Sequence, residues 1–259
     1  MKAIVHIHYA ESLSSAVQPG CIASGLNGNT DMVDTPGRFV WYELMTTDMA
    51  AAKAFYAGVV GWGSQDASTS GLAYAFFTAG STSVGGLMDL PAEARKMGAT
   101  PRWMGYVGVN DVDVISDRIK HLGGAVYVPP TSSNIGRISV VADPQAATLA
   151  VVKGLKSGQQ QPAELGKLGR VGWHELLATD REKAFAFYGE LFGWQKADAE
   201  IGPTNTYQSF SAGGQTIGGI VAKLPIEPVP FWLYYFNIDD IDAATERVKT
   251  GGGEISVAP

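Results

Sequence analysis

An internal repeat constrains the fold of this chain more than any other feature. Residues 39–48 read FVWYELMTTD, and residues 171–180 read VGWHELLATD, so that Trp41 and Trp173 hold the same place 132 residues apart. The Phe-Tyr and Gly-Trp pairs after Trp41 recur after Trp173 at the same spacing. A repeat of this length predicts two copies of one domain rather than one larger domain.

Each copy has the same predicted order of elements. Residues 39–46 alternate between apolar and polar types and are rich in aromatics, as in a half-buried strand. Asp48 stands where a helix N-cap belongs, and the apolar residues after it predict a short helix that stops at glycine. Further strand patterns follow, then a second helix at 112–122 and three more strands. We therefore predict the α+β class, with the order strand-helix-three strands written twice in a complete copy.

The repeat also predicts the domain boundaries. We expect an N-terminal arm at 1–36, a first domain at 37–154, a linker at 155–167 and a second domain at 168–259. The second copy ends at Pro259, which aligns with Pro130, so the counterpart of residues 135–152 is absent from it. Two strands are missing. Either the natural chain continues, or another segment or subunit covers the open sheet edge, because proteins usually cover such edges.

Composition narrows the function classes. The formal net charge of −6 argues against nucleic-acid binding, which depends on clustered Lys and Arg. No apolar run approaches the roughly 18 residues of a membrane span. Cys21 is the only cysteine, which excludes an internal disulfide and fits a reducing compartment. We expect a cytoplasmic protein with a small-molecule ligand, and we leave a homo-oligomer open.

The motifs of the two copies resemble a known family. They are Trp-x-Glu-Leu-x-x-x-Asp, the Phe-Tyr and Gly-Trp pairs, a Gly-Gly-(Leu/Ile) strand, a Val-x-Asp-Val-Asp helix start and the sequence GRISVVADP at 136–144. Together they resemble the vicinal oxygen chelate superfamily, which includes glyoxalase I, extradiol dioxygenases and bleomycin-resistance proteins. The resemblance implies paired βαβββ modules whose curved mixed sheet forms a cup, with the second copy truncated. In that family the cup holds a small ligand, often over a divalent metal.

The resemblance also locates the places where family enzymes carry their metal ligands. In the first copy these places fall on Trp41, at or near Met104, and on Ala150; in the second they fall on Trp173 and about Leu233. None of these side chains is a hard-metal ligand. We therefore predict no metal site of the usual kind and prefer no cofactor, with a divalent metal as the alternative.

Strand parity predicts what lines the cups instead. Residues two apart share a face, so an indole and a carboxylate are expected side by side in each cup, whereas His174 is expected on the face opposite Glu175. Further aromatic residues, among them Tyr106 and Tyr234, lie on strands expected to line the cups. The predicted ligand-binding residues are Trp41, Glu43, Trp103, Trp173, Glu175, Tyr207 and Trp232.

Three functional hypotheses remain from the sequence. The preferred one is binding of a small aromatic or amphipathic molecule without a metal, as in resistance-type sequestration. The alternative is a metal-dependent lyase or dioxygenase with relocated ligands such as Glu43, Glu175 or His174. In the third, the arm or the domain interface binds a protein partner. His6 and His8 share a strand face, and we interpret them as surface residues rather than as a metal site.

Overall fold

The computed structural model describes residues 3–5, 36–155, 166–197 and 207–256. Most of the expected arm and linker lies outside these ranges, and so do Cys21, His6 and His8. In the part of the chain that is described, no helix combines the length and the apolar character needed to cross a bilayer.

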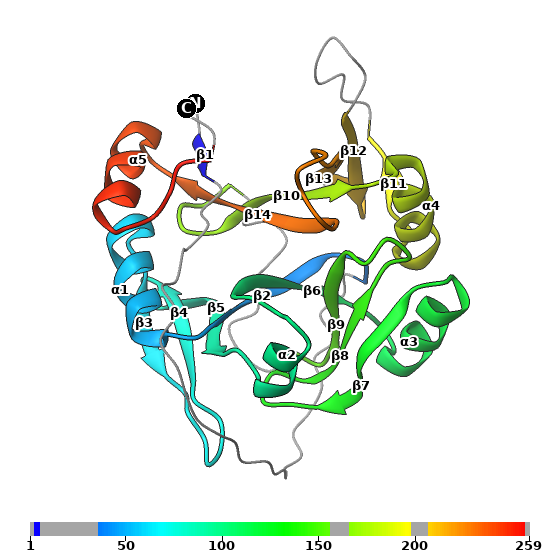
Figure 1. The fold of residues 1–259 in the computed structure, drawn as a ribbon, viewed down its shortest axis with the longest axis horizontal. Coiled ribbons are helices and arrows are strands. Elements are labelled where there is room, and N and C mark those ends of the chain that lie inside the picture. Colours follow the sequence, from blue (N-terminus) through cyan, green and yellow to red (C-terminus); the bar gives the residue numbers. More distant parts are fainter. Residues whose placement is uncertain (1–2, 6–35, 156–165, 198–206, 257–259) are drawn as a thin grey trace.

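The first copy forms an eight-stranded mixed sheet in the order β3-β4-β5-β2-β6-β9-β8-β7. It contains both expected βαβββ modules, and a short helix, α2, lies in the connection between them (Figure 1). The elements are β2 (Phe39–Thr46), α1 (Met49–Val60), β3 (Gly63–Asp66), β4 (Tyr74–Ala79), β5 (Thr82–Asp89), α2 (Ala92–Lys96), β6 (Arg102–Gly108), α3 (Val112–His121), β7 (Ala125–Ser132), β8 (Arg137–Ala142) and β9 (Thr148–Lys153).

The second copy forms a six-stranded sheet in the order β1-β14-β10-β13-β12-β11. It contains one complete module and the first strand and helix of the next, as the repeat predicts. The elements are β10 (Val171–Ala178), α4 (Arg181–Phe192), β11 (Gln195–Lys196), β12 (Tyr207–Ala212), β13 (Gln215–Ala222), β14 (Phe231–Ile238) and α5 (Ile241–Thr250).

The first helix of each copy is bounded as the sequence indicates. The Asp48 carboxylate accepts a hydrogen bond from the backbone N–H of Ala51 at 2.9 Å, and α1 ends at Gly61 in the left-handed conformation. Asp180 and Gly193 bound α4 in the same way. These caps satisfy backbone groups that a helix end leaves open, and glycine adopts a positive φ without steric cost. The aligned caps therefore fix helices of equal length in both copies.

Strand β1 (Ala3–Val5) forms one edge of the second sheet. It pairs with β14, the strand equivalent to β6, whose outer neighbour in the first copy is β9. β9 runs parallel to β6, whereas β1 runs antiparallel to β14. A segment from the beginning of the chain thus lies beside β14, on the side where β9 lies beside β6 in the first copy.

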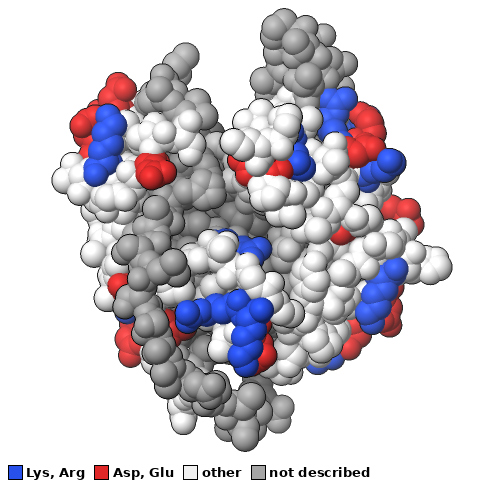
Figure 2. Space-filling model, viewed as in Figure 1, with Lys and Arg blue, Asp and Glu red and all other residues white. Residues whose placement is uncertain are grey.

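The two sheets pack face to face, with α1 beside α5 on one side and α3 beside α4 on the other (Figure 1). Side chains alternate along β2: Tyr42 and Leu44 join the large core between the sheets, whereas Trp41 joins a smaller cluster on the opposite face. Each sheet therefore has one face in the shared core and one concave face of its own. On the face of the molecule shown in Figure 2, basic side chains are interspersed with acidic ones.

The interface between the copies is close to two-fold symmetric. The Trp62 indole N–H donates to the carbonyl of Gly169 at 3.0 Å, and the equivalent Trp194 donates to the carbonyl of Gly37 at 2.5 Å. Each tryptophan thus binds the glycine that precedes the first strand of the other copy. Reciprocal contacts between equivalent residues are the pattern of an isologous dimer interface, here within one chain.

Candidate functional site

The first cup is built around a buried carboxylate. Glu43 on β2 is only 3% exposed and accepts hydrogen bonds from the hydroxyls of Tyr74, at 2.6 Å, and of Tyr106. Burial raises the pKa of Glu43, and the hydrogen bonds from the two tyrosines oppose that rise. The pKa values of Tyr74 and Tyr106 are raised, first by burial and then by the nearby carboxylate. The Glu43 carboxylate and the two tyrosine hydroxyls are therefore paired with one another inside an apolar wall.

The second cup repeats this cluster residue for residue. Glu175 on β10 accepts a hydrogen bond from the hydroxyl of Tyr235 at 2.6 Å, and the Trp173 indole N–H donates to the hydroxyl of Tyr207 at 2.7 Å. Burial raises the pKa of both tyrosines, and the Glu175 carboxylate raises them further. Tyr207 and Tyr235 hold the places of Tyr74 and Tyr106. Both copies therefore place an indole, a carboxylate and two phenols on one concave face.

The two cups differ in access. All four side chains of the first cluster are at most 4% exposed, whereas the four of the second are half-buried. Ile135 and Leu155 pack with Trp41 and Tyr106 in the first cup. Their side chains fill the first cup. Among the described residues, the second cluster is therefore the more accessible of the two to solvent and to ligands.

The structure brings together the three places where the family resemblance locates metal ligands. Trp41, Met104 and Ala150 lie in one buried cluster of the first cup, and in the second sheet Leu233 pairs with Glu175. Indole, thioether and methyl groups do not bind hard divalent ions. Across the described ranges, no three His, Cys, Asp or Glu side chains lie close enough to hold a metal. The residues at these places do not fit the family's metal centre.

The prediction that Trp103 and Trp232 line the cups is wrong. Both side chains face the core between the sheets, where Trp103 donates to the hydroxyl of Tyr56 at 2.8 Å and Trp232 to that of Tyr188 at 3.3 Å. The physical reason is strand alternation. Their neighbours Met104 and Leu233 lie at the cup positions of β6 and β14, so residues 103 and 232 must face the other way. Tyr234 faces the core for the same reason.

His174 lies between the sheets and not in a cup. Its Nδ1 lies 2.6 Å from the carbonyl oxygen of Ile217, and its Nε2 lies 2.5 Å from the hydroxyl of Tyr42. Burial lowers the pKa of His174 to about 4. Its side chain is therefore neutral near neutral pH and fully engaged at the interface, on the face opposite Glu175.

Two site residues, Tyr74 and Tyr235, were not predicted. The alignment of the two copies indicates both residues, because Tyr74 aligns with the predicted Tyr207, and Tyr235 aligns with Tyr106. Comparing the copies position by position finds both residues.

Comparison with known proteins agrees with the fold and the repeat. The family model of the Glyoxalase/Bleomycin resistance protein/Dioxygenase superfamily matches residues 38–151 and again 169–259. The chain belongs to this superfamily and carries two copies of its domain. It is 32% identical over 224 residues to a Mycobacterium tuberculosis protein named "Putative glyoxylase CFP32", covering 85% of this chain and 84% of that one.

A second relative is the anthracycline biosynthesis protein DauV of Streptomyces sp. (strain C5). It is 30% identical over 242 residues, which cover 86% of this chain and 85% of that protein. Among solved structures, the Mn(II)-bound glyoxalase of Novosphingobium aromaticivorans superposes with a TM-score of 0.55 at 17% identity, covering 84% of this chain and 72% of the other. A 4-hydroxymandelate synthase variant from Streptomyces coelicolor gives 0.56 at 16% identity, covering 84% and 76%. At these identities the solved structures support the fold alone.

Proposed function

We propose that the second cup binds a small aromatic molecule with hydroxyl groups, without a divalent metal at the family position. The observation that carries this proposal is the duplicated cluster. The same indole, carboxylate and two phenols are sealed around Glu43 but accessible around Glu175. A concave apolar wall with a few converging polar groups is the usual form of a small-ligand site.

The polar groups of the second cup suit a phenolic ligand. Tyr235 donates to one oxygen of Glu175, and a half-buried carboxylate has further acceptor capacity for a ligand hydroxyl. The ring of Trp173 offers a surface for an aromatic ligand. The relative DauV takes its name from anthracycline biosynthesis, and anthracyclines are fused aromatic rings with phenolic hydroxyls. This supports a flat hydroxylated aromatic as the ligand class.

Calorimetric titration with 1,4-dihydroxyanthraquinone tests the proposal, and the repeat supplies the matched control. Glu175→Gln is expected to weaken binding about tenfold, because a charged acceptor for a ligand hydroxyl is lost. The equivalent Glu43→Gln, in the sealed cup, is expected to leave the affinity unchanged. Equal losses in the two variants, or no binding by the unmodified protein, would contradict the proposal.

The alternative, a metal-dependent lyase or dioxygenase, is favoured by one observation: a glyoxalase of the same fold binds Mn(II). Its relocated ligands are separated here, because Glu43 lies in the first cup, Glu175 in the second and His174 between the sheets. The proposed and alternative functions are distinguished by adding a chelator. Removal of metal would abolish turnover and ligand response in the alternative and would leave dihydroxyanthraquinone binding intact in the proposed function.

A further inference from the structure

An apolar strip crosses the second cup next to Glu175. Leu177 pairs with Val221 of β13 on one side and with Phe231 of β14 on the other. Leu177 lies two residues after Glu175, so the strip shares the cup face and lies about 7 Å from the carboxylate along the strand. All three side chains are half-buried. They therefore offer an apolar surface to a ligand whose hydroxyl is bound at Glu175.

The equivalent strip of the first copy contains a cation. There Met45 pairs with Met88 and with Arg102, and the side chain of Arg102 is exposed. The three residues hold the places of the second strip in the same order, so that Arg102 corresponds to Phe231. One position of the repeat thus carries a guanidinium in one cup and a phenyl ring in the other.

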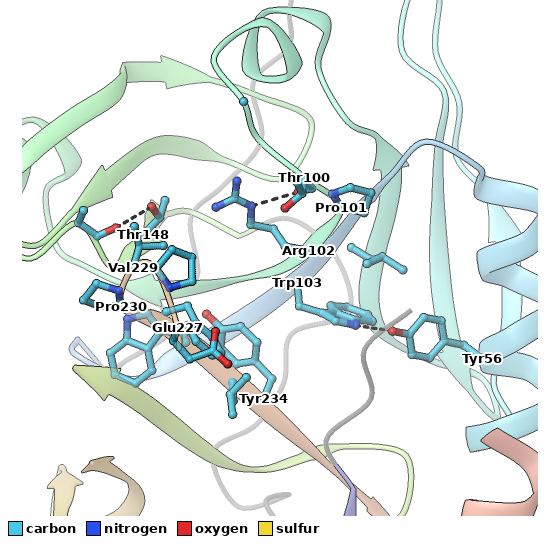
Figure 3. A pocket seen from close by; sticks show the side chains of 17 residues that line it. Tyr56, Thr100, Pro101, Arg102, Trp103, Thr148, Glu227, Val229, Pro230 and Tyr234 are labelled. Carbon is cyan, nitrogen blue, oxygen red and sulfur yellow. Dashed lines mark hydrogen bonds between the residues drawn. The ribbon is translucent and has the colours of Figure 1, made fainter. Parts of the chain in front are cut away.

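A cavity of about 490 Å³ lies between the two sheets and reaches one end of the strip (Figure 3). The segment that leads into β6, residues 98–103, and the segment that leads into β14, residues 227–234, supply most of its lining. Phe231 belongs to that lining. Free space is therefore present beside Phe231, where the strip meets the cavity.

The strands that carry the residues of the second cup supply no positive charge. None of β10, β12, β13 and β14 contains Lys or Arg. Lys223, the residue after β13, donates its ammonium group to the carbonyl of Glu227 at 2.6 Å. A ligand carboxylate above the strip would lie near the Glu175 carboxylate, and like charges repel each other more strongly where water is partly excluded. The strip therefore favours a neutral group over an anionic one.

We propose that the second cup selects a hydroxylated aromatic ligand that is uncharged at the end away from its hydroxyls, and that Phe231 sets this selection. The inference rests on the proposed function, because the ligand hydroxyl is taken to bind at Glu175. The far ring of the ligand packs on Leu177 and Phe231, where burial of apolar surface stabilises a neutral ring. The ligand class is thus a neutral polycyclic phenol rather than an aromatic acid.

Calorimetric titration of the full chain with 1,4-dihydroxyanthraquinone and with its 6-carboxylate tests the selection, because the 6-carboxylate carries its charge on the ring opposite the hydroxyls. We expect the unmodified chain to bind the neutral probe at least about tenfold more tightly. Phe231→Arg should remove or reverse this preference, because a guanidinium pairs with a carboxylate in a bidentate geometry. Phe231→Leu, which keeps the strip apolar, should retain the preference. The matched control is Arg102→Phe in the first copy, which should leave the ratio of the two affinities unchanged.

Equal binding of the two probes by the unmodified chain would overturn the proposal, and this comparison needs no variant. An unchanged preference in Phe231→Arg would overturn it too, and so would a change in Arg102→Phe as large as that in Phe231→Arg. A loss of dihydroxyanthraquinone affinity in Glu175→Gln, together with an unchanged preference in Phe231→Arg, would contradict this inference alone. The absence of binding of both probes would contradict the proposed function as well.

Discussion

Tyr42 and His174 occupy the same position in the two copies and meet each other between the sheets, with the tyrosine hydroxyl 2.5 Å from the imidazole Nε2. The Ile217 carbonyl at 2.6 Å accepts only, so Nδ1 carries the imidazole hydrogen and Nε2 accepts from Tyr42. Phe39 stacks on the imidazole at 4.2 Å between ring centroids. A single position of the repeat thus supplies complementary partners at the pseudo-symmetry axis, as a tyrosine in one copy and a histidine in the other.

This pair predicts a specific dependence of stability on pH. Burial lowers the pKa of His174 to about 4, below its usual 6.5. Between these values the unfolded chain binds a proton at this residue and the folded chain does not, so stability falls as the pH falls from about 6.5 to 4. The contribution is on the order of 3 kcal/mol. Urea unfolding of the unmodified protein and of His174→Gln should show a flatter profile for the variant. Parallel profiles would contradict the assignment.

The symmetric tryptophan contacts predict that two interface glycines resist substitution. Gly37 and Gly169 have φ values of +87° and +70°, and a Cβ there would lie 2.6 Å from the Phe192 carbonyl oxygen and 2.9 Å from the Trp62 indole nitrogen. Gly80 is the control, because its φ is +61° and a Cβ would meet nothing within 4 Å. Alanine at Gly37 or Gly169 should lower the free energy of unfolding by at least about 1 kcal/mol more than alanine at Gly80. Urea unfolding measures these free energies. Equal losses of unfolding free energy at all three glycines would show that the close contacts at Gly37 and Gly169 do not contribute to stability.

The two cups predict different responses to the loss of an equivalent hydroxyl. Tyr106→Phe removes a donor from the buried Glu43 and should cost about 1.5–3 kcal/mol of stability. Tyr235→Phe removes the matching donor from the half-buried Glu175, which water can solvate, and should cost less than about 1 kcal/mol. The comparison of the two unfolding free energies is the measurement. A larger loss of unfolding free energy for Tyr235→Phe than for Tyr106→Phe would contradict the conclusion that the first cup is closed to water and the second is accessible to it.

Much of this fold could be predicted from the sequence, because the repeat shows each helix cap and each strand pattern twice. The caps at Asp48 and Asp180 recur in both copies, and so does the alternation around Glu43 and Glu175, and each confirms the other. Strand parity was enough to place His174 on the face opposite Glu175. The same rule would have placed Trp103 correctly, because its neighbour Met104 had already been assigned to the cup.

Other features depend on tertiary contacts that no local pattern encodes. The pairing of β1 with β14 joins residues more than 200 positions apart, and β1 is only three residues long. The burial of the first cup depends on Ile135 and Leu155, which are distant in sequence from Trp41 and pack with it only in the folded chain. The cavity between the sheets requires both copies to be packed together.

Metal content tests the central claim most directly. The claim is that the cups present indole, carboxylate and phenol groups in place of a set of metal ligands. Elemental analysis of protein purified without a histidine tag should find bound Mn, Fe, Ni and Zn far below stoichiometric amounts. About one equivalent of any of these metals per chain, retained after dialysis and lost in Glu175→Ala, would contradict the claim and favour the metal-dependent enzyme.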